Sequence, residues 1–331
     1  MVAVTLGKLE NIDPRQLWPM EAKDFTPWLA GNLGLLGEAL GLDLELVRME
    51  APVGSFACDI EARDTGSGRR VIIENQLSET DHGHLGQLIT YAAGLEAGVV
   101  VWIAPKVREE HREAIDFLNR HTRETVDFFM IALEVISISG SPPAVVFRLA
   151  ASPNAWAKTA AASASKTLTD KTVAYQEFYQ GLMDELREKH KFTNAKAAQP
   201  QSWYAFSSGT TGISYSTAFA SGNRLRVELY IDVGDMTKNK AIFDALKAQE
   251  QQIEKEIAEP LTWERLDARR ASRISVVREN TSIADASTHE EEIRDWVVKR
   301  LLKFKAVFGP RLKAALAATP PQSANVGVAA A

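Results

Sequence analysis

The stretch VIIENQLSETDHGHLGQLITYAAG, residues 71–94, begins as an apolar strand and ends as a helix. Consecutive apolar residues at its start predict a strand that is covered on both faces. The helix is expected from Asp81 to Leu95, with Thr80 or Asp81 as its N-cap. Polar side chains at the end of a buried strand are costly unless they have partners. The polar segment between the strand and the helix therefore predicts a functional site.

Helix and strand patterns continue on both sides of this stretch. In chain order we expect helix 21–41, strands 42–50, 54–64 and 71–77, helix 81–95, strand 98–104, helix 109–120, and strands 128–138 and 144–149. A Gly-rich turn joins the second and third strands, so these two are expected to be neighbours in a sheet. The order α-β-β-β-α-β, followed by α-β-β, predicts an α/β domain with a mixed, helix-covered sheet.

The second half of the chain has a different pattern. It predicts a helix from residue 173, a three-stranded meander, a helix at 237–257, a strand at 272–279 and a helix at 285–308. The turns GTTG and SGN separate the meander strands, which favours antiparallel pairing and an α+β domain. The expected organisation is a first domain at 1–150, an Ala/Ser-rich linker at 151–172, the α+β domain at 173–314 and a disordered tail at 315–331.

The bulk composition is typical of a globular protein in the cytoplasm. The chain has 331 residues, enough for two domains, and its single cysteine excludes an internal disulfide. We see no apolar run long enough to span a membrane and no signal peptide. Residues 1–150 hold 13 Lys and Arg against 22 Asp and Glu, whereas the remainder holds 25 against 21. The second half is therefore the better partner for a polyanion, although a solvated surface explains the difference equally well.

Two carboxylates are expected to meet at the end of the central strands. Asp59 lies on the strand before the Gly-rich turn, and Glu74 lies on the strand after it. Like charges held together repel each other, and a divalent cation is the usual solution. Strand alternation places Gln76 on the same face as Glu74, and the backbone carbonyl of Asn75 lies between them. Asp59, Glu74 and Asn75 are therefore candidate ligands for Mg²⁺ or Mn²⁺. Gln76 could offer its side-chain carbonyl oxygen to the metal or orient a water molecule.

The helix after the strand adds further polar side chains. His82 and His84 are expected in its first turn, where they could contact phosphate or a metal-bound water, or could simply cap and pack the helix. Gln87 and Tyr91 are one turn apart and share a face. They could contact the site or a nucleic-acid backbone, with ordinary packing as the alternative.

Basic residues of the second domain are candidates for contact with nucleic acid. They are Arg269, Arg270, Arg273, Lys299, Arg300 and Lys303. Lysine and arginine along one face are typical of phosphate binding. Interleaved acidic residues make a salt-bridged, solvated face an equal alternative. The aromatic residues of the meander are expected to be mainly core.

The motif Asp59 … Glu74-Asn75-Gln76 resembles the signature of the PD-(D/E)XK, or restriction-endonuclease-like, nuclease superfamily. It is similar to the subset in which glutamine replaces the lysine, and Gln87 and Tyr91 resemble the Q-x-x-x-Y motif of its RecB-like branch. The strings IENQ, TDHGHLGQ and YAAG resemble a prokaryotic group that pairs this nuclease domain with a C-terminal domain of unknown function. The resemblance covers residues 20–310 and implies an αβββαβ core.

The resemblance also implies a function. Asp59 and Glu74 would hold Mg²⁺ or Mn²⁺, and the protein would hydrolyse phosphodiester bonds for defence or repair, with DNA as the expected substrate and RNA left open. Many relatives carry an acid on the first helix where this chain has Gly31, and Glu21 and Glu38 are the two candidates to replace it. Gln76 cannot act as a base. The alternative is therefore a catalytically inactive nucleic-acid-binding or regulatory protein. We expect no membrane partner, and a homodimer is a further possibility.

Overall fold

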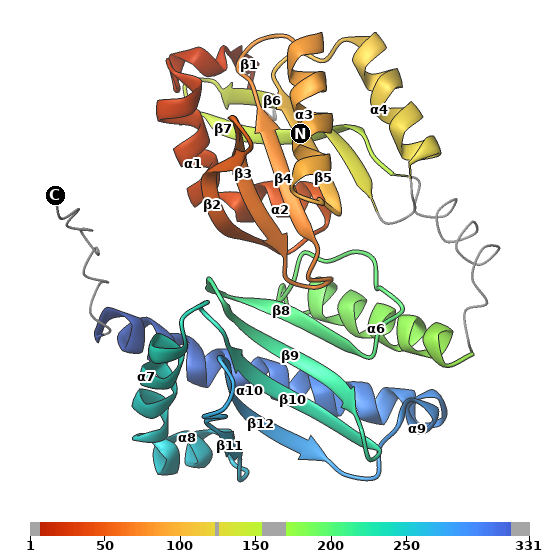
Figure 1. Cartoon of the computed structure of the whole chain (residues 1–331), viewed down its shortest axis with the longest axis vertical. Helices are drawn as coiled ribbons and strands as arrows, with labels where there is room; N and C mark the ends of the chain where they lie inside the picture. The colour runs from red at the N-terminus through yellow and green to blue at the C-terminus, as the bar shows by residue number, and fades with distance from the viewer. Residues whose placement is uncertain (1–6, 123–125, 154–169, 319–331) are drawn as a thin grey trace, which may run out of the picture. The chain divides into compact units, whose positions relative to one another are not determined.

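The computed structural model describes residues 7–122, 126–153 and 170–318. The chain divides into two compact units, Met1–Gln201 and Ser202–Ala331 (Figure 1). Most of the expected linker, residues 154–169, and of the expected tail, residues 319–331, lie outside the described residues. The domain boundaries expected at 150 and 173 stay a prediction.

The first unit is built on a mixed sheet. Its strands are β1 (Leu9–Ile12), β2 (Leu44–Val53), β3 (Phe56–Asp64), β4 (Arg70–Asn75), β5 (Val99–Ala104), β6 (Asp127–Ile138) and β7 (Ala144–Ala151). In the described part of the chain these seven strands have the order β1-β6-β5-β4-β3-β2, with β7 also paired to β6. The β4–β5 and β5–β6 pairs are parallel, and the others are antiparallel. This arrangement confirms the predicted α/β class and element order. The sequence analysis missed β1, which is too short to show alternation.

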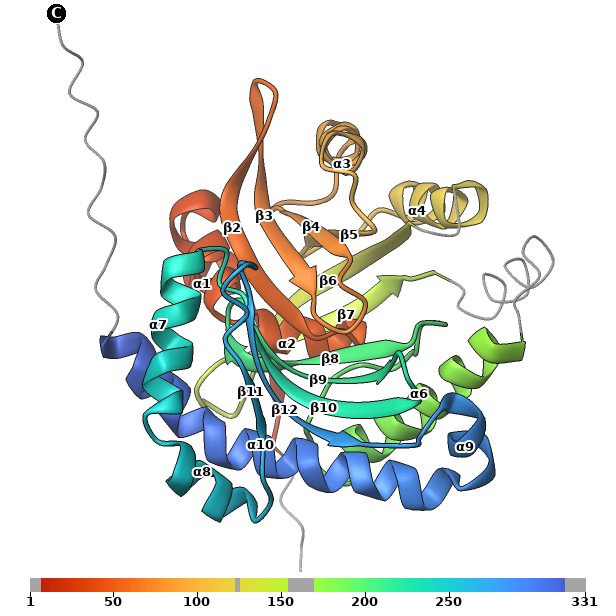
Figure 2. The same cartoon turned by 60° about the horizontal axis from the view of Figure 1, so that its bottom comes forward.

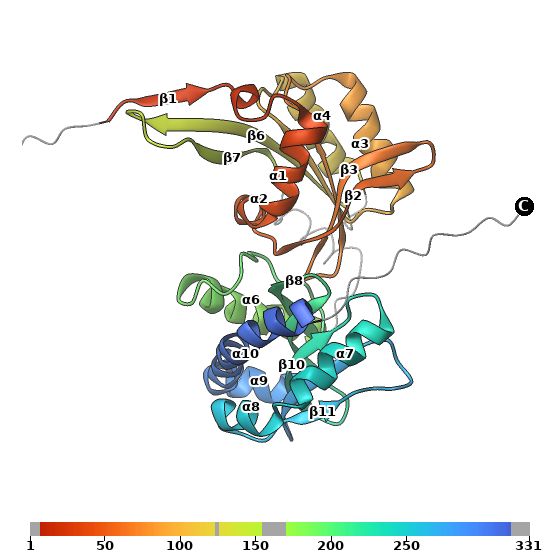
Figure 3. The same cartoon turned by 90° about the vertical axis from the view of Figure 1, so that its left-hand side faces the viewer.

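Helices cover both faces of this sheet (Figure 3). They are the turns η1 (Pro14–Gln16) and η2 (Glu21–Phe25) and the helices α1 (Thr26–Gly31), α2 (Leu33–Leu40), α3 (His82–Gly94) and α4 (Glu109–His121). Helix α6 (Asp170–Glu188) comes later in the chain. Phe25 and Leu29 pack on Ile73 of β4, whereas Leu88 and Tyr91 pack on the next residue back, Ile72. Alternate residues of β4 thus face opposite helical layers, which is why its apolar run is continuous.

The prediction of one continuous helix at 21–41 is wrong. The chain forms a π-helical turn, η2, and then two short helices, α1 and α2. The break falls at Asn32, whose φ of −127° and ψ of 27° are not helical. The Asn32 side chain donates a hydrogen bond of 2.7 Å to the backbone carbonyl of Trp28. An asparagine side chain competes in this way with the backbone bonds of a helix.

The second unit confirms the predicted antiparallel meander. Its strands are β8 (Trp203–Thr210), β9 (Ile213–Ala220), β10 (Arg224–Ile231), β11 (Thr262–Glu264) and β12 (Ser272–Arg278). They form a sheet in the order β11-β12-β10-β9-β8. The helices are α7 (Met236–Lys247), α8 (Glu250–Ile257), α9 (Ile283–Thr288) and α10 (Glu290–Ala318). Helix α10 packs along β8, β9 and β10. No helix in the described part of the chain is long and apolar enough to cross a membrane.

Two predicted helices of this unit are each interrupted. The helix expected at 237–257 breaks between α7 and α8, where Gln249 leaves the helical region. The helix expected at 285–308 is divided into α9 and α10 at His289 and continues to Ala318. A capping box between Ser282 and Asp285 begins α9. The helical apolar spacing continues across both breaks, so periodicity alone does not reveal them.

A buried lysine holds the loop between β11 and β12. The Nζ atom of Lys240 lies 2.6 to 3.0 Å from the backbone carbonyl oxygens of Arg265, Leu266, Arg269 and Ala271, among which its three N–H groups are shared. The next residue back, Asn239, donates to the Arg270 carbonyl at 3.0 Å. Both side chains are buried. The Asn-Lys pair of α7 therefore determines the shape of the arginine-containing loop.

Replacing Lys240 by methionine should destabilise the protein by about 3 kcal/mol or more, because several buried carbonyls lose their donor. Lys238→Met, two positions earlier on the same helix and partly exposed, is the matched control and should change stability by only about 0.5 kcal/mol. Urea denaturation followed by circular dichroism measures both. Equal midpoints for Lys240→Met and the wild type would show that the lysine does not hold the loop.

Candidate functional site

The structure brings Asp59 and Glu74 together at one end of the β3–β4 pair. The last pair of the ladder is Ile60 with Ile73, and the two carboxylates occupy the next positions. One oxygen of Asp59, Oδ2, accepts hydrogen bonds from the backbone N–H of Asn75 at 2.9 Å and from its side-chain amide at 2.7 Å. These two bonds continue the contact between the strands beyond the ladder.

Glu74 is almost completely buried, with 4% of its surface exposed. Among the described residues its Oε2 atom has no hydrogen-bond partner, although the backbone N–H of Asp59 donates to the carboxylate. Burial raises the pKa of Glu74, and the charge of Asp59 raises it further. Burial also raises the pKa of Asp59, despite the bond from Asn75. Two adjacent acids with raised pKa values are typical of sites that bind a cation or transfer protons.

Two more carboxylates add negative charge to this pair. Glu21 and Glu50 both raise the pKa values of Asp59 and Glu74. Glu50 lies opposite Asp59, because the β2–β3 register pairs Met49 with Ile60 and Ala51 with Cys58. Figure 2 shows β2 and β3 as a long hairpin. The sequence analysis missed Glu50, although extending the hairpin pairing back from its turn would have found it.

The structure distinguishes between the two acids considered as replacements at Gly31. Glu21 lies in η2, and its Oε2 accepts a hydrogen bond of 2.7 Å from the backbone N–H of Leu77, just after β4. Glu38 is exposed on α2. A Cβ atom at Gly31 would have no neighbour within 4 Å. Glu21 is therefore the acid of the first helical segment that reaches the carboxylate pair.

Gln76 is fully buried and hydrogen-bonded at both side-chain atoms. Its Oε1 accepts from the indole N–H of Trp102 at 2.8 Å. Its Nε2 donates to the Glu79 carbonyl at 2.8 Å and lies within 3.3 Å of Asp81 Oδ2. The side chain therefore joins β4 to β5 and to the start of α3. Its predicted catalytic role stays a prediction.

Asp81, the second of the two expected caps, is the N-cap of α3. Its Oδ1 accepts from the backbone N–H of His84 at 2.9 Å, and its Oδ2 lies 2.8 Å from His84 Nδ1. Burial opposes the ionised form of Asp81, but the bonds from His84 and Gln76 hold its pKa at about 2. His84 also lowers the pKa of Asp59. This histidine therefore lies within electrostatic range of the carboxylate pair.

The structure pairs His82 with a histidine that the sequence analysis missed. His82 is exposed in the first turn of α3. Its Nδ1 lies 3.0 Å from Nε2 of His111, which is buried in the first turn of α4. His111 Nδ1 lies 2.8 Å from Oγ1 of Thr80. The helical spacing of His111 and the buried Ile115 would have placed both on the same face of α4.

Gln87 and Tyr91 differ in exposure despite their spacing. Gln87 is exposed on α3, whereas Tyr91 is buried against the sheet. Burial raises the pKa of Tyr91, and the charges of Glu74 and Asp59 raise it further. Tyr91 therefore lies near the carboxylates and also serves as core.

The basic residues proposed for nucleic-acid contact are mostly paired within their own unit. Arg270 binds Asp232, Arg273 binds Glu264, Lys299 binds Asp295 and Arg300 binds Glu259. Lys303 donates to the Ile257 carbonyl at 2.8 Å. Arg269 is exposed. These contacts match the salt-bridged alternative, and nucleic-acid contact by these residues stays a prediction.

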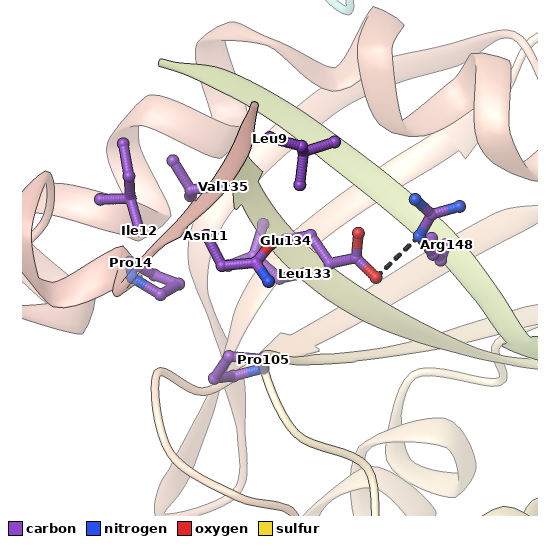
Figure 4. Close-up of a pocket in the computed structure, with 9 residues that line it drawn as sticks. All are labelled: Leu9, Asn11, Ile12, Pro14, Pro105, Leu133, Glu134, Val135 and Arg148. Carbon is purple, nitrogen blue, oxygen red and sulfur yellow. Dashed lines mark hydrogen bonds and ion pairs between the residues drawn. The ribbon is translucent and has the colours of Figure 1, made fainter. Parts of the chain in front are cut away.

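A separate cavity lies beside β1 and β6 (Figure 4). Its volume is about 450 Å³, and its charged lining residues, Glu134 and Arg148, form an ion pair of 2.7 Å. None of the predicted site residues lines it. Within the described ranges, no group of three or more His, Cys, Asp or Glu side chains is arranged to hold a metal ion. The carboxylate pair, where burial and adjacent charge raise both pKa values, is the candidate site.

Comparisons with known proteins give two matches. Residues 174–312 match the model of a family described as a domain of unknown function, DUF4268. A crystal structure of a repair endonuclease from Pyrococcus abyssi is similar over 30% of this chain and 43% of that chain, with 17% identity and a TM-score of 0.26. The chain thus spans less than half the length of that endonuclease. None of the curated proteins matches the chain. The PD-(D/E)XK resemblance stays a prediction.

The raised pKa of Glu74 predicts that the contribution of this residue to the free energy of unfolding falls as the pH rises. The folded chain keeps a proton on Glu74 at pH values where the unfolded chain, with a glutamate pKa of about 4.3, has lost it. The free energy of unfolding should therefore decrease as pH rises through the raised pKa, by at most about 1.4 kcal/mol per pH unit for one proton.

Glu74→Gln should flatten this dependence, because the amide does not ionise. Glu38→Gln, at an exposed position, should behave as the wild type does. Urea denaturation of metal-free protein at several pH values between roughly 5 and 8 measures the effect. A Glu74→Gln protein whose stability changes with pH as the wild type's does would contradict the raised pKa.

Proposed function

We propose that the first unit is a metal-dependent nuclease that hydrolyses phosphodiester bonds, with DNA as its substrate, in defence or repair. The observation that supports this function best is the buried Oε2 atom of Glu74, which lies beside Asp59 and has no hydrogen-bond partner in the part of the chain that the structure describes. A buried carboxylate oxygen without a donor is costly unless a cation binds it.

The residues at the site fit a hard divalent cation. Mg²⁺ and Mn²⁺ prefer oxygen ligands, and Mg²⁺ is held by one or two carboxylates while it keeps several waters. Asp59 and Glu74 would supply carboxylate oxygens, and Asn75 its backbone carbonyl. When bound, the ion would polarise the scissile phosphate and lower the pKa of an attacking water.

The neighbouring side chains would keep these ligands in position. Asn75 holds Asp59 through two hydrogen bonds. Gln76 ties the end of β4 to Trp102 and to the start of α3. Glu21 holds the backbone just after Gln76 and, with Glu50, makes the site more negative, which favours cation binding.

The αβββαβ element order and the motif Asp59 … Glu74-Asn75-Gln76 support the PD-(D/E)XK assignment. Gln76 stands where the superfamily pattern has lysine, and an amide cannot accept the proton of the attacking water. Its hydrogen bonds to Trp102 and Asp81 favour a positioning role. This same observation favours the second candidate function, a protein that binds nucleic acid and a divalent ion without cleavage.

The first test is cleavage of plasmid and linear DNA by purified protein with Mg²⁺, Mn²⁺ or EDTA. The wild type should cleave only with the divalent ion. Glu74→Ala and Asp59→Asn should each lower the rate on the order of 1,000-fold, because each removes several kcal/mol of charge stabilisation. Glu38→Ala is the control on the same unit and should cleave normally.

Calorimetric titration with Mn²⁺ separates the two candidate functions. The nuclease is expected to bind Mn²⁺ stoichiometrically and to cleave DNA, and Asp59→Asn is expected to lose the Mn²⁺ binding. Binding without cleavage would support the inactive nucleic-acid-binding protein. Metal-dependent cleavage that is equal in the wild type and Glu74→Ala would exclude Glu74 as a ligand.

A further inference from the structure

The loops after β4 and β5 meet in a small cluster of hydrogen bonds, which we call the Thr80–His111 cluster. It consists of Thr80, His82, Arg108 and His111. The backbone N–H of Thr80 donates to the Lys106 carbonyl at 3.0 Å, and the backbone N–H of Arg108 donates to Thr80 Oγ1 at 3.0 Å. Thr80 is fully buried, and His111 has 3% of its surface exposed.

The donors in this cluster can be assigned by counting protons. A threonine hydroxyl has one proton to donate, and a neutral histidine has one donor and one acceptor nitrogen. In the described residues, Thr80 Oγ1 contacts only the Arg108 N–H, which must donate, and His111 Nδ1. The buried hydroxyl proton therefore goes to His111 Nδ1, since leaving it unpaired would cost about 1–3 kcal/mol.

The rest of the cluster follows from this first bond. His111 accepts at Nδ1, so its proton is on Nε2 and is donated to His82 Nδ1 at 3.0 Å. His82 then accepts at Nδ1 and carries its own proton on Nε2. Burial lowers the pKa of His111, and the nearby His82 and Arg108 lower it further, which favours the neutral ring. The exposed end of this series of hydrogen bonds is thus the Nε2–H donor of His82.

The cluster lies on the same side of the sheet as Glu74, because Glu74 shares the face of β4 with Ile72, which packs in the same layer as Trp102. In the parallel β4–β5 pair, Trp102 is the register partner of Glu74. The Trp102 indole bonds to Gln76 and contacts the His111 ring, with the ring centroids 5.4 Å apart. The His82 and His111 rings meet edge to face, with centroids 4.9 Å apart. His82 is therefore on the β5 side of Glu74, whereas Asp59 is on the β3 side.

Among the described residues, two cations and three carboxylates surround the cluster. Lys106 and Arg108 share one carboxylate, Glu79, at 2.8 and 3.0 Å. Asp81 contacts His84 at 2.8 Å. The charge of Glu110 acts to raise the pKa of His111. The Lys106 and Arg108 side chains are 74% and 54% exposed. Two exposed cations with one shared partner favour phosphate binding.

We propose that His82, oriented by His111 and Thr80, donates its Nε2–H to a backbone phosphate of the DNA substrate beside the carboxylate pair. The proposal rests on the proposed nuclease function and adds a substrate contact to it. His82 is the contact residue, and His111 and Thr80 are positioning residues. A neutral donor of fixed direction favours a phosphate at one place, whereas a flexible lysine would bind it over a range of positions.

Fluorescence anisotropy with a labelled DNA duplex, in EDTA and at several salt concentrations, tests the contact without cleavage. His82→Ala should weaken binding roughly 10-fold, as expected for a hydrogen bond to a charged group. His82→Gln keeps an N–H donor and should recover most of this loss. His121→Ala, an exposed histidine on the same helix as His111, is the control and should bind as the wild type does.

The salt dependence identifies the charge state of His82. A neutral donor releases no counterion, so His82→Ala should leave the slope of log K against log salt unchanged. Lys106→Ala should reduce the slope by about 0.9, as expected for one cation. A similar reduction of the slope in His82→Ala would show that His82 binds as a cation, and would overturn its assignment as a neutral donor.

Two further measurements test the positioning residues. His111→Phe should weaken binding as much as His82→Ala, and the double variant should be no weaker than either, because the two rings act as a unit. Imidazole ¹⁵N shifts should show the Nε2–H form for both rings. Additive losses, or an Nδ1–H form of His111, would overturn the assignment.

These outcomes separate the two proposals. Wild-type protein that cleaves DNA with Mn²⁺ while His82→Ala binds and cleaves equally well overturns the role of His82 alone. Wild-type protein that neither binds nor cleaves DNA overturns the proposed function and the phosphate contact together. Thermal melting of each variant shows whether it is folded.

Discussion

The two hydrogen bonds from Asn75 to one oxygen of Asp59 are the constraint on which the site depends. They hold β3 to β4 one step beyond the ladder, and they leave Glu74 beside a second carboxylate. The hydroxyl of Thr26 in turn donates to the Asn75 side chain at 3.2 Å. The carboxylate pair is thus fixed from the helical layer as well as from the sheet. A flexible pair would separate, because like charges repel.

Gln76 extends this constraint to the other side of β4. Its amide connects β4 with Trp102 on β5 and with the cap of α3. Through Trp102, the same connection reaches His111 on α4. Together with Thr26 of α1, which binds Asn75, side chains from three helical segments, α1, α3 and α4, are therefore positioned by the buried end of β4. Polar networks of this kind are stable only when their members are satisfied. Oε2 of Glu74 has no hydrogen-bond partner among the described residues, and it is where we propose that the cation binds.

The second unit uses its charges differently. Its arginines mostly pair with acids of the same unit, and Lys240 is buried among backbone carbonyls. Charge patterns along a sequence do not distinguish an arginine that faces a ligand from one that faces a neighbouring glutamate. The difference depends on strand register, as in the pairing of Arg273 with Glu264 across β12 and β11.

The sequence by itself determined the order of the elements, the meander and the carboxylates at the strand ends. These features depend on local periodicity and on the short β3–β4 turn. Glu50, the choice of Glu21 over Glu38, the pairing of His82 with His111, and the helix breaks at Asn32 and His289 were decided only by the tertiary structure. Each depends on strand register, on side-chain hydrogen bonds, or on contacts between residues far apart in the chain. Spacing along the sequence does not specify such contacts, because packing selects them after the elements have formed.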